Sequence, residues 1–411
     1  MMPDFELDTD RIATGGAAIG YAPDGRVCFV DGALPGERVA VEVVTEKRRH
    51  FEVKTLEVLS RAPGRATPAC DQVERGCGGC DWQHASSELQ TTLRQAIVVD
   101  CLRRIAGIES VTVETGPELP AAGYRTTVRV AIEGERAGFR RHRKHEVVVA
   151  TEGCMVAHPL IDQIITHGRF HGCPHATIRV GANTGERMVL LPAGGEVTFG
   201  PGVDRPDEIQ IVEEGASHPG EAPVYHELIH GVRFQVSAPS FFQCRPDGAA
   251  ALVDVVDSMV QHRSGILLDA YSGVGLFAAT VGRDRDVVAV ESNRFAVADA
   301  GVNLAPRASD NQASEGTRRV EIVRCDMKRW RPHAVDTVVA DPAREGLGAP
   351  VVERLAETKA KEIILVSCDP ASLARDARLF QERGYQLERV VTVDLFGQTS
   401  HVESVSRFVP R

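Results

Sequence analysis

The sequence predicts an α/β protein in three parts: a small antiparallel β-barrel, a β-rich central domain and a parallel sheet covered by helices. Residues 1–62 alternate short β-rich runs with glycine turns, which is typical of a small barrel. From Tyr124 to about Glu214 the chain is again mostly β. After Phe234 apolar strands alternate with helical stretches, as in a largely parallel sheet with helices on both faces. The predicted domains are therefore residues 1–62, 63–235 and 236–411.

Composition bounds the class of protein. The chain has 411 residues, 43% hydrophobic and 25% charged, which is enough for two or three cores. No apolar run approaches the roughly 18 residues that span a bilayer, so we expect no membrane partner. The acidic start MMPDFELDTD lacks a signal-peptide pattern. We therefore expect a cytoplasmic monomer, whose 10 cysteines are metal ligands or catalytic thiols more readily than disulfides.

The charge distribution leaves nucleic-acid binding open. A formal net charge of −10 argues only weakly against it, because affinity depends on local basic patches. Two segments are dense in cations: EKRRHFEVK at 46–54 and RRHRKH at 140–145. Each is either a phosphate-contacting surface or an ordinary solvated face.

One long helix is expected between the first two β-rich regions. RAPGRATP at 61–68 is typical of a linker. In the stretch that begins SSELQTTL, the apolar residues Leu89, Leu93, Ile97 and Leu102 approximate one helical face.

The stretch LLDAYSGVGLFAAT predicts a strand, a glycine turn and the start of a helix. Gly273 and Gly275 let the backbone approach a ligand closely beside the helix N-terminus. With Ala278 they also satisfy a loose G-x-G-x-x-A pattern, and Glu291 closes the next strand as a ribose-binding acid. An NAD-linked oxidoreductase is thus one open interpretation.

Two further acids shift this interpretation toward S-adenosylmethionine. Asp326 ends the third strand and Asp341 the fourth, at the strand ends where open α/β sheets place their ligands. An acid on the third strand can accept from an adenine amino group, and nearby carboxylates favour a sulfonium. Strand-end turn acids explain one such residue, but not three in succession.

The stretch EIILVSCDPASLARD places Cys368 at the end of the fifth apolar strand. Asp369 suits a helix N-cap and Pro370 the first helical position, so the thiol should lie just outside a helix N-terminus. The positive end of the helix dipole favours a thiolate. A nucleophile is the hypothesis; an inert core cysteine is the alternative.

A thiolate beside a methyl donor indicates one chemistry. The C5 atom of uracil is a weak nucleophile, but thiolate addition at C6 gives an enolate that can accept a methyl group at C5. A base must then remove the C5 proton. The run QTSHVESV offers His401 and Glu403, two residues apart on a β-like stretch and facing the same way. We choose Glu403, which is an anion at neutral pH without tuning, although a lone Glu in a terminal strand is more often a surface residue.

A four-cysteine site is predicted between the barrel and the central domain. Cys70, Cys77 and Cys80 form C-x6-C-x2-C, and Cys154 in TEGCMVAHP supplies the fourth ligand. Four thiolates suit either a [4Fe–4S] cluster or a structural zinc ion, and spacing barely separates them. The remaining thiols show no partner pattern: Cys28, Cys101, Cys173, Cys244 and Cys325.

Six motifs together carry a resemblance: CGGCDWQH, SAPSFFQ, LDAYSGVGLFA, DPAREGL, SCDPASLARD and FGQTSHVESVS. In this order they resemble the bacterial RNA 5-methyluridine methyltransferases, and specifically the iron–sulfur branch that modifies 23S ribosomal RNA, over essentially the entire chain. The resemblance implies a class I (Rossmann-like) S-adenosylmethionine-dependent catalytic domain and an OB-like TRAM barrel that binds RNA. It assigns the nucleophile to Cys368 and the base to Glu403.

The resemblance also implies ligand residues. Its cofactor positions match Gln243, Tyr271, Glu291, Asp326 and Asp341, beside the glycine loop, and it favours a [4Fe–4S] cluster on the four cysteines. Where many relatives have Asp-Pro-Pro-Arg this chain has Asp-Pro-Ala-Arg at 341–344, and its first cysteine pair is spaced by six residues where many have five.

Transfer RNA is the runner-up substrate, because the transfer-RNA enzymes of this superfamily generally lack the barrel and the cysteine set. A non-catalytic RNA-binding scaffold is the remaining alternative class. It would leave the Cys-Asp-Pro segment without a chemical role.

Overall fold

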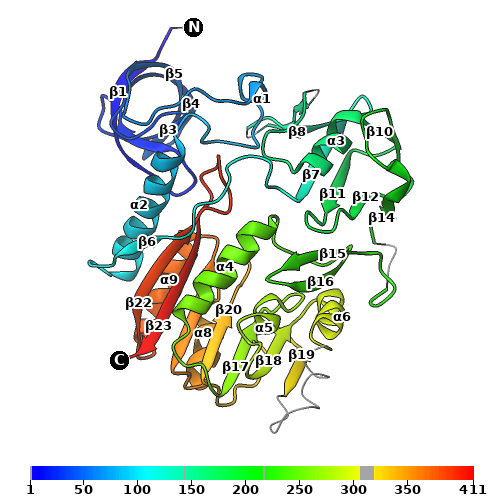
Figure 1. Cartoon of the computed structure of the whole chain (residues 1–411). Helices are drawn as coiled ribbons and strands as arrows, with labels where there is room; N and C mark the ends of the chain where they lie inside the picture. The colour runs from blue at the N-terminus through cyan, green and yellow to red at the C-terminus, as the bar shows by residue number, and fades with distance from the viewer. Residues whose placement is uncertain (1, 143, 151, 216–217, 306–318) are drawn as a thin grey trace.

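The computed structural model describes residues 2–142, 144–150, 152–215, 218–305 and 319–411. Figure 1 shows the blue barrel at one end of the molecule, the green central domain beside it, and the helix-covered sheet at the other end. Among these described residues no helix is long and apolar enough to cross a membrane.

The N-terminal part is a closed five-stranded barrel with the strand order β1-β2-β3-β5-β4. Its turns at Gly25 and Gly36 have φ of +86°, as the sequence predicts for turn glycines. The predicted barrel is confirmed, but it is not wholly antiparallel, since β3 and β5 pair in parallel. An odd number of strands cannot alternate direction all the way around a closed barrel. The strands are β1 (Phe5–Ile12), β2 (Ala18–Tyr21), β3 (Val27–Asp31), β4 (Arg38–Glu46) and β5 (His50–Ser60).

After α1 (Asp71–Glu74), helix α2 (Ser87–Ala106) joins the barrel to the third domain. The Ser86 side chain caps α2 by accepting from the Leu89 N–H group, and Gly107 ends it at φ +67°. Helix α2 packs against α9 (Pro370–Glu382), and β6 (Val113–Thr115) adds to the sheet of the third domain by pairing in parallel with β22 (Tyr385–Val393). Residues 87–115 therefore pack on the third domain, although they lie within the predicted central span.

The central domain is built on a six-stranded sheet of order β14-β12-β11-β7-β8-β9. Its core packs α3 against this sheet through apolar residues such as Ile161, Ile164 and Ile178. The β10–β13 pair lies beside it. The elements are β7 (Thr127–Glu133), β8 (Arg136–Arg140), β9 (Val147–Val149), α3 (Pro159–His167), β10 (Gly168–His171), β11 (His175–Val180), β12 (Arg187–Leu191), β13 (Glu196–Phe199), the 3₁₀ turn Pro206–Glu208 and β14 (Ile209–Glu213).

The third domain is an eight-stranded sheet of order β19-β18-β17-β20-β21-β23-β22-β6. Strands β17 to β21 pair in parallel, whereas β23 runs antiparallel between β21 and β22. Its further elements are α4 (Pro246–Met259), β17 (Ile266–Ala270), α5 (Leu276–Ala279), β18 (Asp286–Glu291), α6 (Arg294–Asn303), β19 (Val320–Arg324), β20 (Thr337–Ala340), α8 (Gly348–Glu357), β21 (Glu362–Ser367) and β23 (Glu403–Pro410). The predicted sheet with helices on both faces is confirmed.

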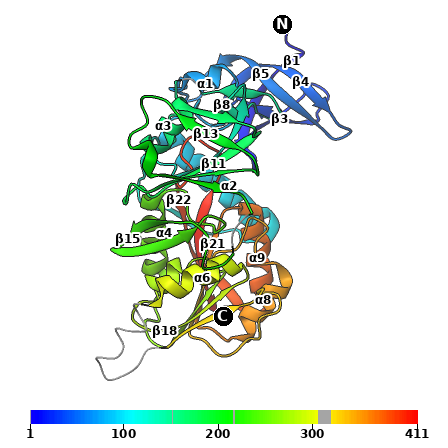
Figure 2. The same cartoon turned by 90° about the vertical axis from the view of Figure 1, so that its right-hand side faces the viewer.

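Side-chain alternation explains why both faces of this sheet are covered. In β21, Ile363 and Leu365 belong to a core shared with α2, α8 and α9, whereas Ile364 and Val366 belong to a core shared with α4, α5 and α6. Successive residues of a strand point to opposite faces, so an unbroken apolar strand needs cover on both. Figure 2 shows α8 and α9 on one side of the sheet and α4 on the other.

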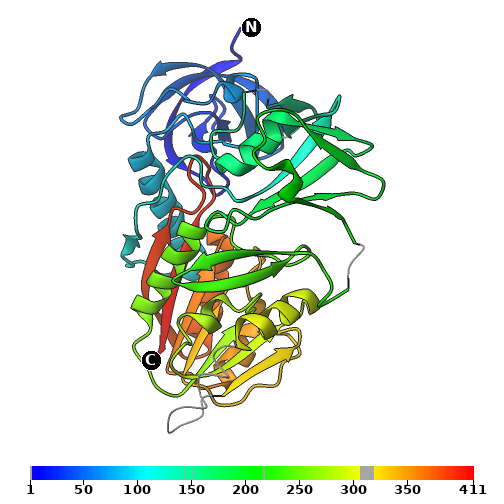
Figure 3. The same ribbon diagram turned by 45° about the vertical axis from the view of Figure 1, so that its right-hand side comes forward.

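A hairpin of β15 (Val224–Ile229) and β16 (Val232–Ser237) lies against the third domain, as Figure 3 shows from another side. Asp299 of α6 is fully buried and accepts from the Ser237 N–H at 2.9 Å, the Ser237 hydroxyl at 2.6 Å and the Ser240 hydroxyl at 2.6 Å. These bonds fix the loop that leads from β16 to Gln243.

Candidate active site

The carboxyl ends of the parallel strands meet at one rim of the sheet. Strand β17 lies between β18 and β20, so the strand order reverses there, and open α/β sheets bind ligands in the crevice outside such a switch point. Five of the residues singled out in the sequence follow or close successive strands at this rim: Tyr271 after β17, Glu291 on β18, Asp326 after β19, Asp341 after β20 and Cys368 after β21.

Antiparallel pairing brings Glu403 to the same rim. Ser367 on β21 pairs with Ser404 on β23, so the register carries Cys368 opposite Glu403 one step further on. On its other side Glu403 pairs with Val393 of β22. The β21–β23 register makes Cys368 and Glu403 neighbours where the sheet meets its rim. Glu403 is buried there and Cys368 is half-buried.

Asp341 and Gln243 complete this group. The Gln243 side-chain amide donates to Asp341 Oδ2 at 3.2 Å, joining the loop after β16 to the end of β20. Burial raises the pKa of Asp341 to about 7, although the hydrogen bond from Gln243 works against this. The pKa of Glu403 is raised well above its usual range, first by burial and then by the charge of Asp341. Two carboxyl groups thus share one poorly solvated site.

The Cys368 thiol is not the resting thiolate that the sequence predicts. Asp369 does cap α9 by accepting from the Ser372 N–H group at 2.8 Å, and Pro370 is the first helical residue. Nevertheless burial, followed by the charges of Glu403 and Asp341, raises the pKa of Cys368 to about 12. The sequence analysis considered the helix dipole alone, whereas burial and then two carboxyl groups from other strands act in the opposite direction.

The glycine loop forms as predicted, but the helix behind it is a single turn, α5. Tyr271 takes φ +63° and Gly273 φ +53°, and a Cβ atom on Gly273 would meet nothing within 4 Å. The Gly273 N–H group donates to Glu291 Oε2 at 3.0 Å. The loop is therefore tied to the carboxylate of the neighbouring strand, with open space above Gly273.

Asp269 is a residue that the sequence analysis missed. It is fully buried on β17, and burial raises its pKa to about 8. Its Oδ2 atom accepts from the Ala278 N–H group at 2.7 Å and so holds the glycine loop, whereas Oδ1 has no hydrogen-bond partner among the described residues. The signal was present in LLDA, since a charged residue inside an apolar strand demands a reason.

Asp326 lies at the outer end of the series. It is exposed, and its Oδ1 atom accepts from the Lys328 N–H group at 2.8 Å. Its charge contributes to raising the pKa of Tyr271 to about 12, after the larger effect of burial. Asp326 therefore lies near the glycine loop with its second carboxylate oxygen available.

The four cysteines of the predicted metal site line one cavity, together with Arg125 and apolar side chains. Burial raises the pKa of Cys77, Cys80 and Cys154. Four thiols on one cavity have the donor chemistry that soft metal centres require. Within the described ranges, however, no group of three or more His, Cys, Asp or Glu side chains is arranged to hold a metal ion.

The first basic segment spans the β4–β5 turn and the start of β5, and the second spans the β8–β9 turn. Residues 47–49 are exposed at the β4–β5 turn, and the 140–145 segment connects β8 and β9, with Arg143 outside the described residues. The second turn packs on the cysteine loop. Cys77 forms an isolated antiparallel β-bridge with Arg141, and the Gly78 N–H group donates to the Arg140 carbonyl oxygen. The cysteine site and a cationic surface are thus one structural unit.

The strand order, the glycine loop and the rim acids define a Rossmann-like methyltransferase fold. The family model described as tRNA (Uracil-5-)-methyltransferase matches residues 229–408. A Streptomyces avermitilis protein named as an uncharacterized RNA methyltransferase is 34% identical over 439 residues, covering 100% of this chain and 99% of that protein. The chain belongs to this family of RNA uracil-5-methyltransferases, as its motifs predict. The NAD-linked alternative is therefore set aside.

Two further similarities bear on the RNA substrate. The Pseudomonas putida 23S rRNA (uracil(1939)-C(5))-methyltransferase RlmD is 29% identical, covering 98% of this chain and 93% of that protein. The crystal structure of the Pyrococcus abyssi tRNA (uracil-54, C5)-methyltransferase has a TM-score of 0.72 and 24% identity, covering 98% of this chain and 99% of its own. This chain and the Pyrococcus abyssi protein therefore share their fold over nearly their whole lengths.

Alkylation of Cys368 should be slow and governed by its carboxylate neighbours. Asp341→Asn removes a charge that raises the thiol pKa, so the thiolate fraction at about pH 8.5 should rise and the rate by roughly 3-fold. Iodoacetamide labelling, followed by mass spectrometry of the Cys368 peptide, measures this rate, with the Cys173 peptide as internal reference.

The exposed helix residue Asp254 gives the matched control, Asp254→Asn. Equal Cys368 rates in the wild type and Asp341→Asn would contradict the carboxylate effect.

Proposed function

We propose that this protein transfers a methyl group from S-adenosylmethionine to C5 of a uridine in RNA, through a covalent bond between Cys368 Sγ and uracil C6. The observation that carries the proposal is the β21–β23 register, which sets a thiol opposite a buried carboxyl group. A nucleophile and a base within reach of one ring are what this substitution requires.

The residues act in a fixed order. The Cys368 thiol gives its proton to solvent and its sulfur attacks C6, and the electrons of the C5–C6 double bond move toward C5 and O4. S-adenosylmethionine would supply an electrophilic methyl group: C5 bonds to this methyl carbon, its bond to the sulfonium sulfur breaks, and neutral S-adenosylhomocysteine leaves. Glu403 then takes the C5 proton, the double bond reforms and the C6–sulfur bond breaks, returning the thiolate. Burial raises the pKa of Glu403, so Glu403 must be ionised before this step, and once ionised it binds a proton more tightly than an ordinary carboxylate.

Electrostatics supports this order. In the structure as it stands, burial raises the pKa of the Cys368 thiol, and the charges of Glu403 and Asp341 raise it further. A sulfonium bound near Asp341 would offset their charge and lower the pKa values of Cys368, Asp341 and Glu403 together. The nucleophile would then be activated only when a methyl donor is in place.

The rim residues fit the methyl donor. Open space above Gly273, a free lone-pair direction on Glu291 and the carboxylate of Asp341 would accommodate a ribose and a sulfonium group. Gln243 would orient Asp341, Tyr271 and Gly275 would shape the loop, and Asp326 would accept from the adenine amino group.

We propose 23S ribosomal RNA as the substrate and transfer RNA as the second candidate. The named Pseudomonas putida relative supports the first, and the family description and the Pyrococcus abyssi structure keep the second in view. The barrel, as a TRAM domain, and the exposed cations of the β4–β5 and β8–β9 turns would contact RNA phosphates while a uridine is turned out toward Cys368.

We further propose that Cys70, Cys77, Cys80 and Cys154 hold a [4Fe–4S] cluster with a structural role. Their common cavity and thiol chemistry support it. Uracil methylation needs no electron, so the cluster would tie the linker to the central domain. A cytoplasmic location suits both the thiols and the RNA substrate.

Substitution of Cys368 tests the covalent mechanism. Wild-type protein with S-adenosylmethionine and RNA containing 5-fluorouridine should form a stable protein–RNA adduct. Fluorine replaces the C5 hydrogen, so the base has no C5 proton to remove and the C6–sulfur bond cannot break. Cys368→Ala should form no adduct and lose at least about 10³-fold in methylation of ordinary RNA. Adducts are counted on denaturing gels, with Cys325→Ala as the matched control. An equal adduct yield from Cys368→Ala would overturn the proposal.

Mass mapping of 5-methyluridine separates the two RNA substrates. Deletion of the gene should remove the modification from a site in 23S ribosomal RNA and leave transfer RNA unchanged, and re-expression of the wild-type protein, but not Cys368→Ala, should restore it. Loss confined to transfer RNA would instead establish the second candidate.

Anaerobically purified protein should contain about four iron and four sulfide per chain. Cys77→Ser should lose most of both, whereas Cys173→Ser, a cysteine outside the cavity, should keep them. Iron, sulfide and zinc are assayed together on the same sample. One zinc per chain without sulfide would replace the cluster by a zinc site.

A further inference from the structure

Polar contacts from several neighbouring segments hold the loop that leads to Glu403. Residues 394–402 connect β22 to β23, and Glu403 is the first residue after this loop. Leu395 and Val402 anchor the loop in the two cores of the third domain, and hydrogen bonds hold the residues between them. These bonds come from α2, from the segment that follows the last cysteine of the CGGC motif, and from the side chains of Tyr124 and Arg245.

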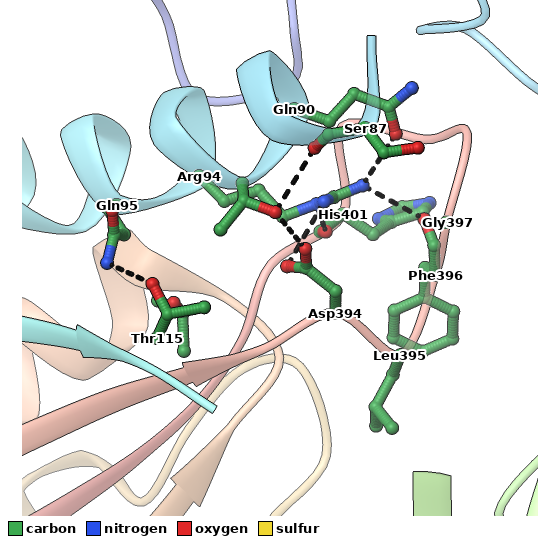
Figure 4. A network of polar contacts seen from close by, with 12 residues as sticks. Ser87, Gln90, Arg94, Gln95, Thr115, Asp394, Leu395, Phe396, Gly397 and His401 are labelled. Carbon is green, nitrogen blue, oxygen red and sulfur yellow. Dashed lines mark hydrogen bonds and ion pairs between the residues drawn. The ribbon is translucent and has the colours of Figure 1, made fainter. Parts of the chain in front are cut away.

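Arg94 on α2 binds the loop at four points. Its guanidinium group donates to the carbonyl oxygens of His401 at 3.1 Å, Phe396 at 3.3 Å and Thr399 at 2.8 Å. It also pairs with Asp394 at 3.1 Å. Figure 4 shows the side chain reaching from the helix into the curve of the loop. Arg94 is only 1% exposed, so these charge-assisted bonds form away from water.

The next turn of α2 holds a strained residue of the same loop. Gln398 has φ of +69°, a conformation that a side chain other than glycine rarely adopts. Its N–H group donates to Gln90 Oε1 at 3.0 Å, and its side-chain oxygen accepts from Gln90 Nε2 at 3.2 Å. Its carbonyl accepts from the Trp82 N–H group at 3.0 Å. Such a conformation persists where the surroundings fix it, which these three bonds do.

A third contact comes from the cysteine segment. Asp81, which follows Cys80 directly, accepts from the Ser400 N–H group at 2.9 Å and from the Ser400 hydroxyl at 2.6 Å. The two residues are distant in the chain, and their contact ties the cysteine site to the loop three residues before Glu403.

We propose that Arg94 is a positioning residue for Glu403, and that Arg94 together with the Asp81–Ser400 contact fixes the base against the bound uridine. We call Arg94 and the Asp81–Ser400 contact the clamp. This inference rests on the proposed function, because it assigns the clamp to one step of that reaction. The contacts hold residues 394–401, directly before Glu403, whereas Cys368 lies on β21 and makes none of them. Proton removal from C5 therefore depends on these contacts. A displaced Glu403 should not slow thiol addition, because the charge of Glu403 raises the pKa of the Cys368 thiol.

This separation of steps gives a measurable signature. Loss of Glu403 should stop the reaction after methyl transfer, with methylated RNA still bonded to Cys368. A displaced Glu403 should do the same to a smaller degree. A general loss of structure would instead lower adduct formation and product release together.

The experiment compares four variants by single-turnover kinetics on ordinary RNA. Glu403→Gln defines the fully trapped adduct. Arg94→Lys keeps the charge beside Asp394 but lacks the planar fork that reaches three carbonyls, and Ser400→Ala removes one hydroxyl. Arg104→Lys is the matched control, since Arg104 is an exposed residue of the same helix. Thermal melting confirms that each variant is folded.

We expect Arg94→Lys to slow release of methylated RNA on the order of 10- to 100-fold and to accumulate adduct, with adduct formation within about 3-fold of wild type. Ser400→Ala should change release in the same direction by less, and Arg104→Lys should match wild type. Equal slowing of both steps by Arg94→Lys and by Ser400→Ala, or no slowing, would overturn the inference. Absence of adduct in Glu403→Gln would instead overturn the role of Glu403 in the proposed function, and the inference with it.

Discussion

The antiparallel return of β23 between β21 and β22 is the constraint on which the site depends. A purely parallel sheet would bring only the residues at the ends of its own strands to the rim. Here the chain turns back after β22, and the β21–β23 register sets Glu403 opposite Cys368. The loop before β23 must therefore be held in place, which explains why α2 and the cysteine segment contact it so closely. Helix α2 and the cysteine segment thus help to position Glu403, the first residue of the last strand.

The rim concentrates acidic groups in a poorly solvated place. Asp341, Glu403 and Asp269 all have raised pKa values, with burial as the first cause in each. Burial also raises the pKa of the Cys368 thiol, and the charges of Glu403 and Asp341 add to this effect. Such an arrangement is costly for a folded protein unless a cation occupies it for part of the cycle. In the proposed reaction that cation is the sulfonium of the methyl donor. The acidic groups that help to raise the pKa of the Cys368 thiol would then also bind this sulfonium.

Strand periodicity and the residues at strand ends predicted the barrel, the doubly covered sheet and the run of rim acids. Local patterns failed where distant segments meet. The pairing of β6 with β22 and the packing of α2 on the third domain leave little trace in them. In the sequence, Arg94 looks like any other polar residue of an amphipathic helix. Its role could not be predicted, because it is buried by a loop some 300 residues away. The direction of the Cys368 pKa shift also escaped local patterns, because it follows from burial under other elements and then from two carboxyl groups on other strands.

The central claim is that Cys368 adds to the uracil ring and that Glu403 later removes the C5 proton. Release of tritium from RNA labelled at C5 of uridine tests it most directly, measured beside methyl incorporation. Wild-type protein should release tritium in step with methyl transfer, Cys368→Ser should release none, and Glu403→Gln should bond to methylated RNA that retains its tritium. Tritium release by Cys368→Ser at the wild-type rate would contradict covalent addition by Cys368.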